Sequence, residues 1–406
     1  MSTTLQEVNL ADPDVFVQGV PHDMFDVLRK EAPVYFHAGN DEIQPFWCVV
    51  KNEDVRVLSR DYPHFSSERG GITLFDPDEE QMAQQRMMML QMDPPKHTKL
   101  RVLVNKGFTP RMVGQLHQHV RDIARTIVDG MIERGECDFV VDVASELPLQ
   151  VIAEIMGVPQ EDRYKLFDWS NRMIGSQDPE YAVSSENAMQ AATEMFLYAN
   201  ELAAKKRANP DDDIISALLQ AEVDGEKLND IEFDLFFELL AVAGNETTRN
   251  LVSHGMHLLL EHPDQHQRLV DDPSLVDTAV EEMLRYASPV MYMRRTVQSE
   301  FELHGETLRE GDKVALWYIA ANRDEDLFDD PHRFDVGRTP NEHVAFGGGG
   351  PHFCLGANLA RLETRIMFAE LLTRLRDVEL TGPVQRLRSN FINGIKHMPV
   401  RFASSQ

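Results

Sequence analysis

One stretch constrains the fold of this chain more than any other, because residues 230–262 keep a helical period of apolar positions without a break. Shorter segments of the same period lie at residues 23–30, 115–134, 149–156, 214–219, 274–286 and 358–375. Short strand-like runs predict an early hairpin and a later sheet, at residues 33–37, 46–50, 296–303, 313–318 and 391–395. Because strands and helices do not alternate regularly, we expect a mainly α fold with small β-sheets.

The composition disfavours several classes of partner. The 406 residues carry 40 basic and 67 acidic side chains, a net charge of −27, which argues against binding to nucleic acid or to an anionic membrane surface. No apolar run reaches the roughly 18 residues that a spanning helix needs, and the N-terminal residues do not resemble a signal peptide. Since neither a repeat nor a Gly/Ser linker occurs, residues 1–406 are expected to form a single cytoplasmic domain without a membrane anchor.

The cysteines Cys48, Cys137 and Cys354 are too few and too far apart for a disulfide framework, which indicates a reducing compartment. Cys354 lies between four glycines and a helical pattern, in GGGGPHFCLGANLAR. Such a loop could cradle a phosphate, hold half of a metal site or present a single thiolate. The first needs a GK[ST] or GxGxxG pattern and the second needs further ligands nearby. A thiolate just before a helix is favoured by free N–H groups and by the helix dipole.

Residues 346–361, FGGGGPHFCLGANLAR, resemble the haem-binding loop of the cytochromes P450. The resemblance implies the cytochrome P450 fold, with haem b between a long central helix and the helix after the cysteine. It makes Cys354 the iron ligand, with Phe346 shielding the sulfur, His352 reaching a haem propionate and Gly356 letting the next helix pass close under the ring. Phe346 lies one residue farther from the cysteine than in the commonest pattern. This longer loop resembles that of bacterial enzymes that oxidise sterol side chains, branched lipids and fatty acids.

The long helical stretch contains AGNETT, which matches the family's oxygen-activation motif. The match implies that Thr247 hydrogen-bonds bound dioxygen or an adjacent water, and that Glu246 relays protons from solvent. Taken alone, AGNETT could equally be a polar patch on an ordinary helix. Its position ahead of the thiolate loop favours the catalytic interpretation.

EEMLRY places Glu282 and Arg285 three residues apart, on one face of a predicted helix. Alone, such a pair is commonly a surface ion pair. In the family it is a structural lock, completed by an arginine from a PxRF segment, which is Arg333 in PHRF here, with Arg338 as a nearby rival. We expect these residues to support the thiolate loop and to take no part in catalysis.

Basic residues at several places suit a cofactor with two carboxylates. DPPKHTKLR puts His97 and Arg101 four residues apart, where two prolines set a helix start. Both match the family's propionate contacts, as does Arg295 in MRRTV. Each alone could be a solvated cation, but together with His352 they form a predicted propionate site.

The substrate cavity is expected above the ring, at the family's substrate-facing positions. Methionine clusters such as RMMMLQM more often fill a core than contact a ligand, although flexible thioethers suit a bulky hydrocarbon. The predicted pocket residues are Ile72, Leu74 and Phe75, then Met87, Met88 and Leu90 within residues 87–90, then Val242, Ala243, Val290, Met293, Phe391 and Ile392.

The resemblance implies a haem-thiolate monooxygenase that inserts one oxygen atom from O2 into a C–H bond of a hydrophobic substrate. The longer cysteine loop and FINGIKH near the C-terminus favour a steroid or sterol, with a fatty-acid or terpenoid hydroxylase as the alternative. A haem-binding sensor without turnover is a further hypothesis, but a sensor has no need for both Glu246 and Thr247.

No flavin or nicotinamide fingerprint occurs in the sequence, so electrons are expected from NAD(P)H through a separate ferredoxin reductase and ferredoxin. An acidic ferredoxin would dock on the thiolate side of the molecule. The basic patch expected there consists of Lys99, Lys106, Arg111, Arg361 and Arg365. We expect the protein to be a monomer.

Overall fold

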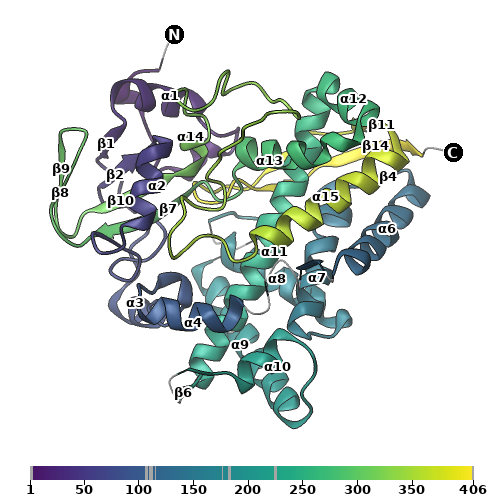
Figure 1. The fold of residues 1–406 in the computed structure, drawn as a ribbon, viewed down its shortest axis with the longest axis horizontal. Helices are drawn as coiled ribbons and strands as arrows, with labels where there is room; N and C mark the ends of the chain where they lie inside the picture. The colour runs from purple at the N-terminus through teal and green to yellow at the C-terminus, as the bar shows by residue number, and fades with distance from the viewer. Residues whose placement is uncertain are drawn as a thin grey trace.

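The computed structural model describes residues 3–105, 108, 113–114, 116–175, 177–181, 184–223 and 226–404. Figure 1 shows α11 (Asp230–Glu261) in the middle of the molecule, with α15 (Ala357–Arg374) packed against it. The predicted long helix is confirmed over nearly its whole length. The Asn229 side chain caps its first turn by accepting a hydrogen bond from the N–H of Glu232, and the helix ends one residue before Pro263 begins another.

Helices form most of the described fold. Those predicted from their period are α1 (His22–Glu31), α6 (His117–Arg134), α7 (Glu146–Met156), α10 (Ile214–Gln220) and α13 (Val276–Ala287), and α4 (Lys96–Asn105) begins directly after the two prolines. Helices not predicted are α2 (Asn52–Arg60), α3 (Glu79–Gln85), α8 (Arg163–Ile174), α9 (Ser185–Ala208), α12 (Pro263–Asp271) and α14 (Tyr318–Ala321). Short turns are η1 (Leu5–Glu7), η2 (Pro13–Phe16), η3 (Met89–Gln91), η5 (Val140–Ala144), η6 (Gln160–Asp162) and η7 (Pro273–Leu275).

The largest sheet joins segments that lie far apart in the sequence, as the purple and green strands of Figure 1 show. Its strand order is β1 (Val34–His37), β2 (Phe46–Val49), β10 (Lys313–Trp317), β7 (Tyr292–Val297) and β3 (Phe65–Ser66). The predicted hairpin is confirmed, since β1 and β2 pair antiparallel, and β10 then pairs parallel to β2. The early hairpin and the later strands therefore form one sheet.

The remaining strands are short and lie in small sheets. They are β4 (Glu136–Asp138), β11 (Leu375–Leu380) and β14 (Pro399–Ser404) in one sheet, and the pairs β5 (Glu222–Val223) with β6 (Glu226–Lys227), β8 (Phe301–Leu303) with β9 (Glu306–Leu308), and β12 (Gln385–Arg386) with β13 (Ile395–His397). Two strand predictions need correction. Residues 296–303 are divided between β7 and β8, and residues 391–395 contribute only a bridge from Ile392 to Val290 before β13 starts.

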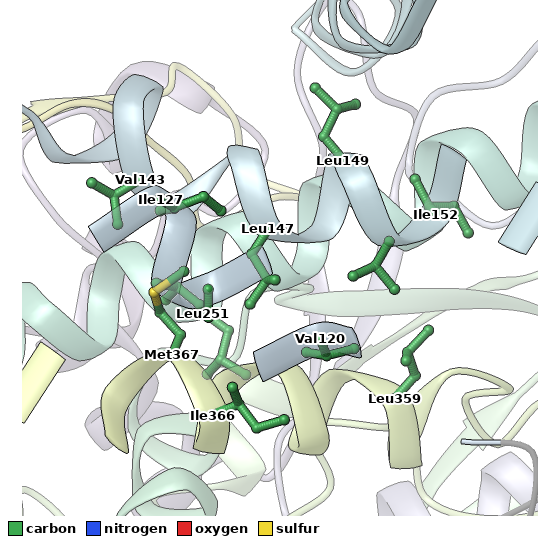
Figure 2. Close-up of a cluster of buried hydrophobic side chains, with 14 of the residues drawn as sticks. Val120, Ile127, Val143, Leu147, Leu149, Ile152, Leu251, Leu359, Ile366 and Met367 are labelled. Atoms are coloured by element: carbon green, nitrogen blue, oxygen red, sulfur yellow. The ribbon is translucent and has the colours of Figure 1, made fainter. Parts of the chain in front are cut away.

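The largest hydrophobic core lies where α6, α7, α11 and α15 meet. Figure 2 shows side chains from these four helices packed together, among them Val120, Ile127, Leu147, Leu149, Ile152, Leu251, Leu359, Ile366 and Met367. This core fixes α11 against α15, and it thereby sets the distance between the AGNETT segment and the loop that carries Cys354. Among the helices that the structure describes, none combines the length and apolar character needed to cross a membrane.

Candidate active site

A cavity of about 240 Å3 lies between α11, β7 and the loop that precedes α15. Its walls are mainly apolar, but polar groups enter it from several elements. The polar lining residues are His97, Arg101, Thr247, Thr248, Arg295, Tyr318, His352, Cys354 and Glu363. The structure therefore brings the predicted thiolate, the predicted propionate residues and the threonine of AGNETT to one enclosed space.

The Cys354 thiol faces this cavity and is accessible from it, although protein surrounds it. Its backbone N–H donates a hydrogen bond to the Phe346 carbonyl at 3.0 Å, which closes the loop. Burial raises the pKa of the thiol, whereas a hydrogen bond from the Gly356 N–H and the charges of Arg101 and Arg361 lower it. The site is thus built to hold a thiolate, provided that a positive partner offsets the cost of burial.

The glycines before Cys354 serve the protein's own packing. An added Cβ on Gly348 would lie 2.6 Å from the Val55 carbonyl, and one on Gly350 would lie 2.6 Å from the Ser59 carbonyl, both on α2. Gly347, Gly349 and Gly350 also have positive φ angles of 95°, 95° and 76°. By contrast, a Cβ on Gly356 would meet nothing within 4 Å, since this residue borders the open cavity. Space for a flat ligand is therefore found at Gly356.

Four basic side chains meet at one end of the cavity, namely His97, Arg101, Arg295 and His352. The His97 and His352 rings lie 4.3 Å apart, and the buried Nδ1 of His97 and Nε2 of His352 have no hydrogen-bond partner. Burial and the nearby arginines lower the pKa of His97 to about 4 and that of His352 to about 2. Within the described part of the chain, no carboxylate forms an ion pair with any of the four.

This end of the cavity therefore gathers basic side chains for which the described part of the protein provides no anion. Among the described residues, the Arg101 guanidinium donates to the Phe353 carbonyl, and Arg295 donates to the Arg294 carbonyl at 2.8 Å. Tyr318, which the sequence did not indicate, adds a buried phenol to the same lining. A haem, which carries two carboxylates on an apolar ring and one axial position for a thiolate, fits this set of groups.

The two predicted catalytic residues of α11 face different surroundings. The Thr247 hydroxyl lines the cavity and donates to the Ala243 carbonyl at 2.9 Å. Glu246 lies beside the cavity rather than in its lining, fully buried, and accepts a hydrogen bond from Arg249 at 2.5 Å. Burial raises the pKa of Glu246, and Arg249 lowers it. The other carboxylate oxygen, Oε1, has no partner, whereas Arg249 also donates to Asn171 of α8 at 2.7 Å.

The lock predicted around Glu282 is present, but its third member is not Arg333. Arg285 donates two hydrogen bonds to the Glu282 carboxylate, at 2.7 and 2.8 Å, and Arg338 adds a third at 3.2 Å. The Arg333 side chain is 60% exposed, and its nearest carboxylate is that of Asp335 at 3.9 Å. The assignment of Arg333 is therefore wrong, because the chain after PHRF turns back and places Arg338 beside the carboxylate.

The predicted substrate residues divide into two groups. Those that line the cavity are Ile72, Leu90, Ala243, Val290 and Met293. The other predicted residues do not line it, namely Leu74, Phe75, Met87, Met88, Val242, Phe391 and Ile392. Leu74, Phe75 and Phe391 pack instead into the core beside Tyr292, and Val242 of α11 packs against the largest hydrophobic core.

Several lining residues escaped prediction because none of them is a defining residue of a recognised motif. They are Phe108, Ile152, Leu239, Leu240, Leu251, Leu284 and Pro289, whereas Met89 falls within the predicted residues 87–90 and lines the cavity with Leu90. One signal was available in the sequence. Leu239, Ala243, Thr247 and Leu251 recur at every fourth residue of α11, so the period alone identifies the wall that they form.

The structure describes three residues of the predicted basic patch, Lys99, Arg361 and Arg365. Lys106 and Arg111 lie outside the described residues. Arg361 is bound by the Glu281 carboxylate at 2.6 and 2.8 Å and lies over the Phe346 ring, so its charge is largely compensated. Arg365 is more exposed, with Asp277 at 3.2 Å.

Comparison with known proteins identifies the family to which the chain belongs. The family model described as Cytochrome P450 matches residues 16–395. A steroid C26-monooxygenase of Rhodococcus jostii is 43% identical over 405 residues, which cover 98% of this chain and 85% of the relative. A methyl-branched lipid omega-hydroxylase of Mycobacterium tuberculosis is 44% identical over 392 residues, which cover 93% and 90%. A solved Mycobacterium marinum enzyme in complex with pseudoionone superposes with a TM-score of 0.92 at 38% identity, covering 98% and 99%.

Proposed function

Because this chain belongs to the cytochrome P450 family and is a haem-dependent monooxygenase, we propose that its substrate is a steroid or sterol hydroxylated at an unactivated C–H bond. The observation that carries the proposal is the enclosed apolar cavity with the Cys354 thiol at one wall and the Thr247 hydroxyl at another. The steroid C26-monooxygenase relatives support the substrate class. Similarity of equal strength to a methyl-branched lipid omega-hydroxylase makes a branched or straight-chain lipid the second candidate.

The residues proposed to hold the haem are the thiol of Cys354 and the four basic side chains His97, Arg101, Arg295 and His352. When bound, the haem supplies the oxygen chemistry that amino-acid side chains lack. The Gly356 N–H would stabilise the thiolate by its hydrogen bond to sulfur, and the cations would neutralise the propionates. Phe346 would shield the sulfur from solvent, since its ring packs between Phe353 and the Arg361 guanidinium.

Proton delivery is assigned to Thr247 and Glu246. The Thr247 hydroxyl donates its own proton to the Ala243 carbonyl, so its oxygen can accept a hydrogen bond from a group in the cavity. Glu246 is buried next to it in the sequence and keeps one unpartnered oxygen, Oε1. Burial raises the pKa of this carboxyl, which favours its taking up a proton. Rotation of Glu246 away from Arg249 would then pass the proton toward Thr247.

The apolar lining positions the substrate and excludes water. Leu239 and Ala243 from α11 face Val290 and Met293 from the segment around β7, and Ile72 closes the cavity from another side. A hydrocarbon held between these side chains is stabilised by leaving water. Specificity therefore rests on the shape of the cavity.

A spectral titration of the haem-loaded enzyme tests the substrate class. A panel of steroids and a panel of fatty acids and terpenes are added while the Soret band is recorded. We expect steroids to shift the band at lower concentration. A shift with lipids alone would replace the steroid assignment by the second candidate.

The Thr247 assignment has its own test. Thr247→Ala is expected to uncouple electron consumption from hydroxylation, and Thr247→Ser, which keeps the hydroxyl, should restore most of the coupling. Product and NAD(P)H consumption are measured together. Full coupling in the alanine variant would contradict the assignment.

The proposed electron route runs from NAD(P)H through a ferredoxin reductase and an acidic ferredoxin, with this protein acting as a cytoplasmic monomer. The exposed Phe353 and Arg365 near the Cys354 loop offer an apolar and a basic contact for such a donor. Arg365→Glu should slow reduction by ferredoxin and leave substrate binding unchanged. The same charge reversal at Arg207, on α9, is the control.

A further inference from the structure

The segment of residues 71–76, here called the strap, runs along the part of β7 that does not pair with β3. The Arg294 N–H donates to the Ile72 carbonyl at 2.9 Å, and the Leu74 N–H donates to the Tyr292 hydroxyl at 3.1 Å. Ile72 reaches the cavity lining, while Leu74 is fully buried behind it. The conformation of the strap therefore decides where one wall of the cavity lies.

Two buried cations hold the strap. Arg294 Nη1 donates to the carbonyls of Thr73 and Phe75, at 3.2 and 3.3 Å, and to Asp76 Oδ1 at 2.9 Å. Lys313 of β10 donates to the Leu74 carbonyl at 3.4 Å and to Asp76 Oδ2. Every carbonyl from Ile72 to Phe75 is thus bound by a group of β7 or β10.

Asp76 is the group that makes this arrangement favourable. The side chains of Arg294 and Lys313 are only 5% and 9% exposed, and burial lowers the pKa of both. In the described part of the chain, Asp76 is the carboxylate that pairs with each of them. Removal of its charge would leave two neighbouring cations without an anion, and both would then be pulled toward solvent.

The side chains of β7 connect the strap to the cavity. Met293 and Arg295 line the cavity, whereas Tyr292 and Arg294, at the alternating positions, contact the strap. The contact is close, since a Cβ on Gly70 would lie 2.2 Å from Arg294 Nη2. A movement of the strap would therefore displace side chains on both faces of β7.

We propose that Asp76 is a positioning residue that clamps the strap through Arg294 and Lys313, fixes Ile72 in the cavity wall, and so determines which ligand shapes the enzyme accepts. The link to substrate choice rests on the proposed function. The clamp itself does not, because it concerns the shape of the cavity for any ligand.

The test compares haem-loaded wild type with Asp76→Asn and Lys313→Met, and with Glu80→Gln as an exposed charge control. Imidazole and the bulkier 4-phenylimidazole are titrated against the Soret band. We expect the affinity ratio of the two azoles to change at least about tenfold in both clamp variants, the scale on which a misfit of one methylene group discriminates ligands. Imidazole alone should bind within about twofold of wild type.

Hydrogen exchange gives an independent readout. Backbone amides of residues 71–76 should exchange at least about tenfold faster in Asp76→Asn, with other segments unchanged. Lys313→Arg, which retains the charge, should keep the wild-type azole ratio. An unchanged ratio with unchanged exchange would overturn the proposal, and so would an equal loss for both azoles with faster exchange throughout the chain. Since azoles replace the substrate, a failure of the steroid assignment leaves these results unaffected.

Discussion

Glu282 on α13 and Glu246 on α11 share a sequence pattern, because each is followed three residues later by an arginine and each pair is buried. Their hydrogen bonding differs. Both oxygens of Glu282 are bound, by Arg285, by Arg338 at 3.2 Å, by the Asp335 N–H at 3.0 Å and by Asn341 at 3.1 Å. Within the described residues, Glu246 accepts from Arg249 alone and keeps one oxygen without a partner.

The difference separates a structural role from a chemical one. A carboxylate that is bound on both oxygens cannot move without leaving several donors unpaired. A buried carboxyl with one unpartnered oxygen takes up a proton at a lower free-energy cost than one that is bound on both oxygens. Burial also raises the pKa of Glu246. The same Glu-x-x-Arg spacing can therefore hold a fold or carry protons, and the surrounding donors decide which.

The largest expected effect is that of Glu282→Ala. The change leaves the buried Arg285 without its carboxylate, which should lower the free energy of unfolding by about 3–5 kcal/mol. Asp277→Ala on the same helix is the control, and its side chain is 74% exposed, so a loss of at most about 1 kcal/mol is expected. Chemical denaturation of the haem-loaded variants measures both. Equal losses would remove the distinction between Glu282 and a surface carboxylate.

The features predicted from sequence were those with local causes. The helical period of α11, the prolines before α4 and the Cys354 loop each depend on neighbouring residues, and the structure has them at the predicted places. The long helix α9 was not predicted because its apolar residues lie on more than one face, with Met189 and Leu197 64% and 65% exposed. The single-domain organisation stays a prediction.

Features that depend on distant contacts could not be predicted. The segment 391–395 has strand composition, yet its backbone over residues 391–393 pairs with the irregular residues 289–291, since the Met291 N–H donates to the Phe391 carbonyl and the Asn393 N–H donates to the Pro289 carbonyl, each at 2.9 Å. Tyr318 enters the cavity only because β10 joins the sheet beside β7. Likewise, the spacing of PHRF could not reveal that Arg338 would reach Glu282.

A third buried glutamate extends the comparison, because Glu363 on α15 has neither an arginine nor a hydrogen-bond partner among the described residues. Burial raises its pKa from 4.5 to about 8. Between these two values the folded protein holds a proton that the unfolded chain releases, so the free energy of unfolding falls as pH rises through this window. From pH 5 to pH 7 the loss should be about 2 kcal/mol, at ~1.4 kcal/mol per unit.

Glu363→Gln tests this, since glutamine has the same shape and does not titrate. Denaturation of wild type and variant is followed from pH 5 to pH 8. We expect the variant to gain stability over wild type as pH rises. Parallel pH profiles would show that Glu363 is ionised in the folded protein.

Arg249→Met should have a smaller effect on stability than Glu282→Ala. Loss of the arginine leaves Glu246 able to take up a proton, so no charge remains stranded, and the expected cost is about 1–2 kcal/mol. The pH profile of the hydroxylation rate should shift in this variant, because the contact between Glu246 and Arg249 is gone. A cost as large as that of Glu282→Ala would mean that Glu246 belongs to a second structural lock.

The smallest difference concerns the two arginines near Glu282. Arg338→Met removes one bond to the carboxylate and three to backbone carbonyls, whereas Arg333→Met removes an exposed side chain 3.9 Å from Asp335. We expect Arg338→Met to lower the free energy of unfolding by about 1–2 kcal/mol and Arg333→Met by at most about 0.5 kcal/mol. The two variants carry the same change of charge and volume, so the difference between their denaturation midpoints measures the contacts that Arg338 makes with Glu282 and with the three backbone carbonyls. A larger loss for Arg333→Met would restore the arginine of PHRF to the lock.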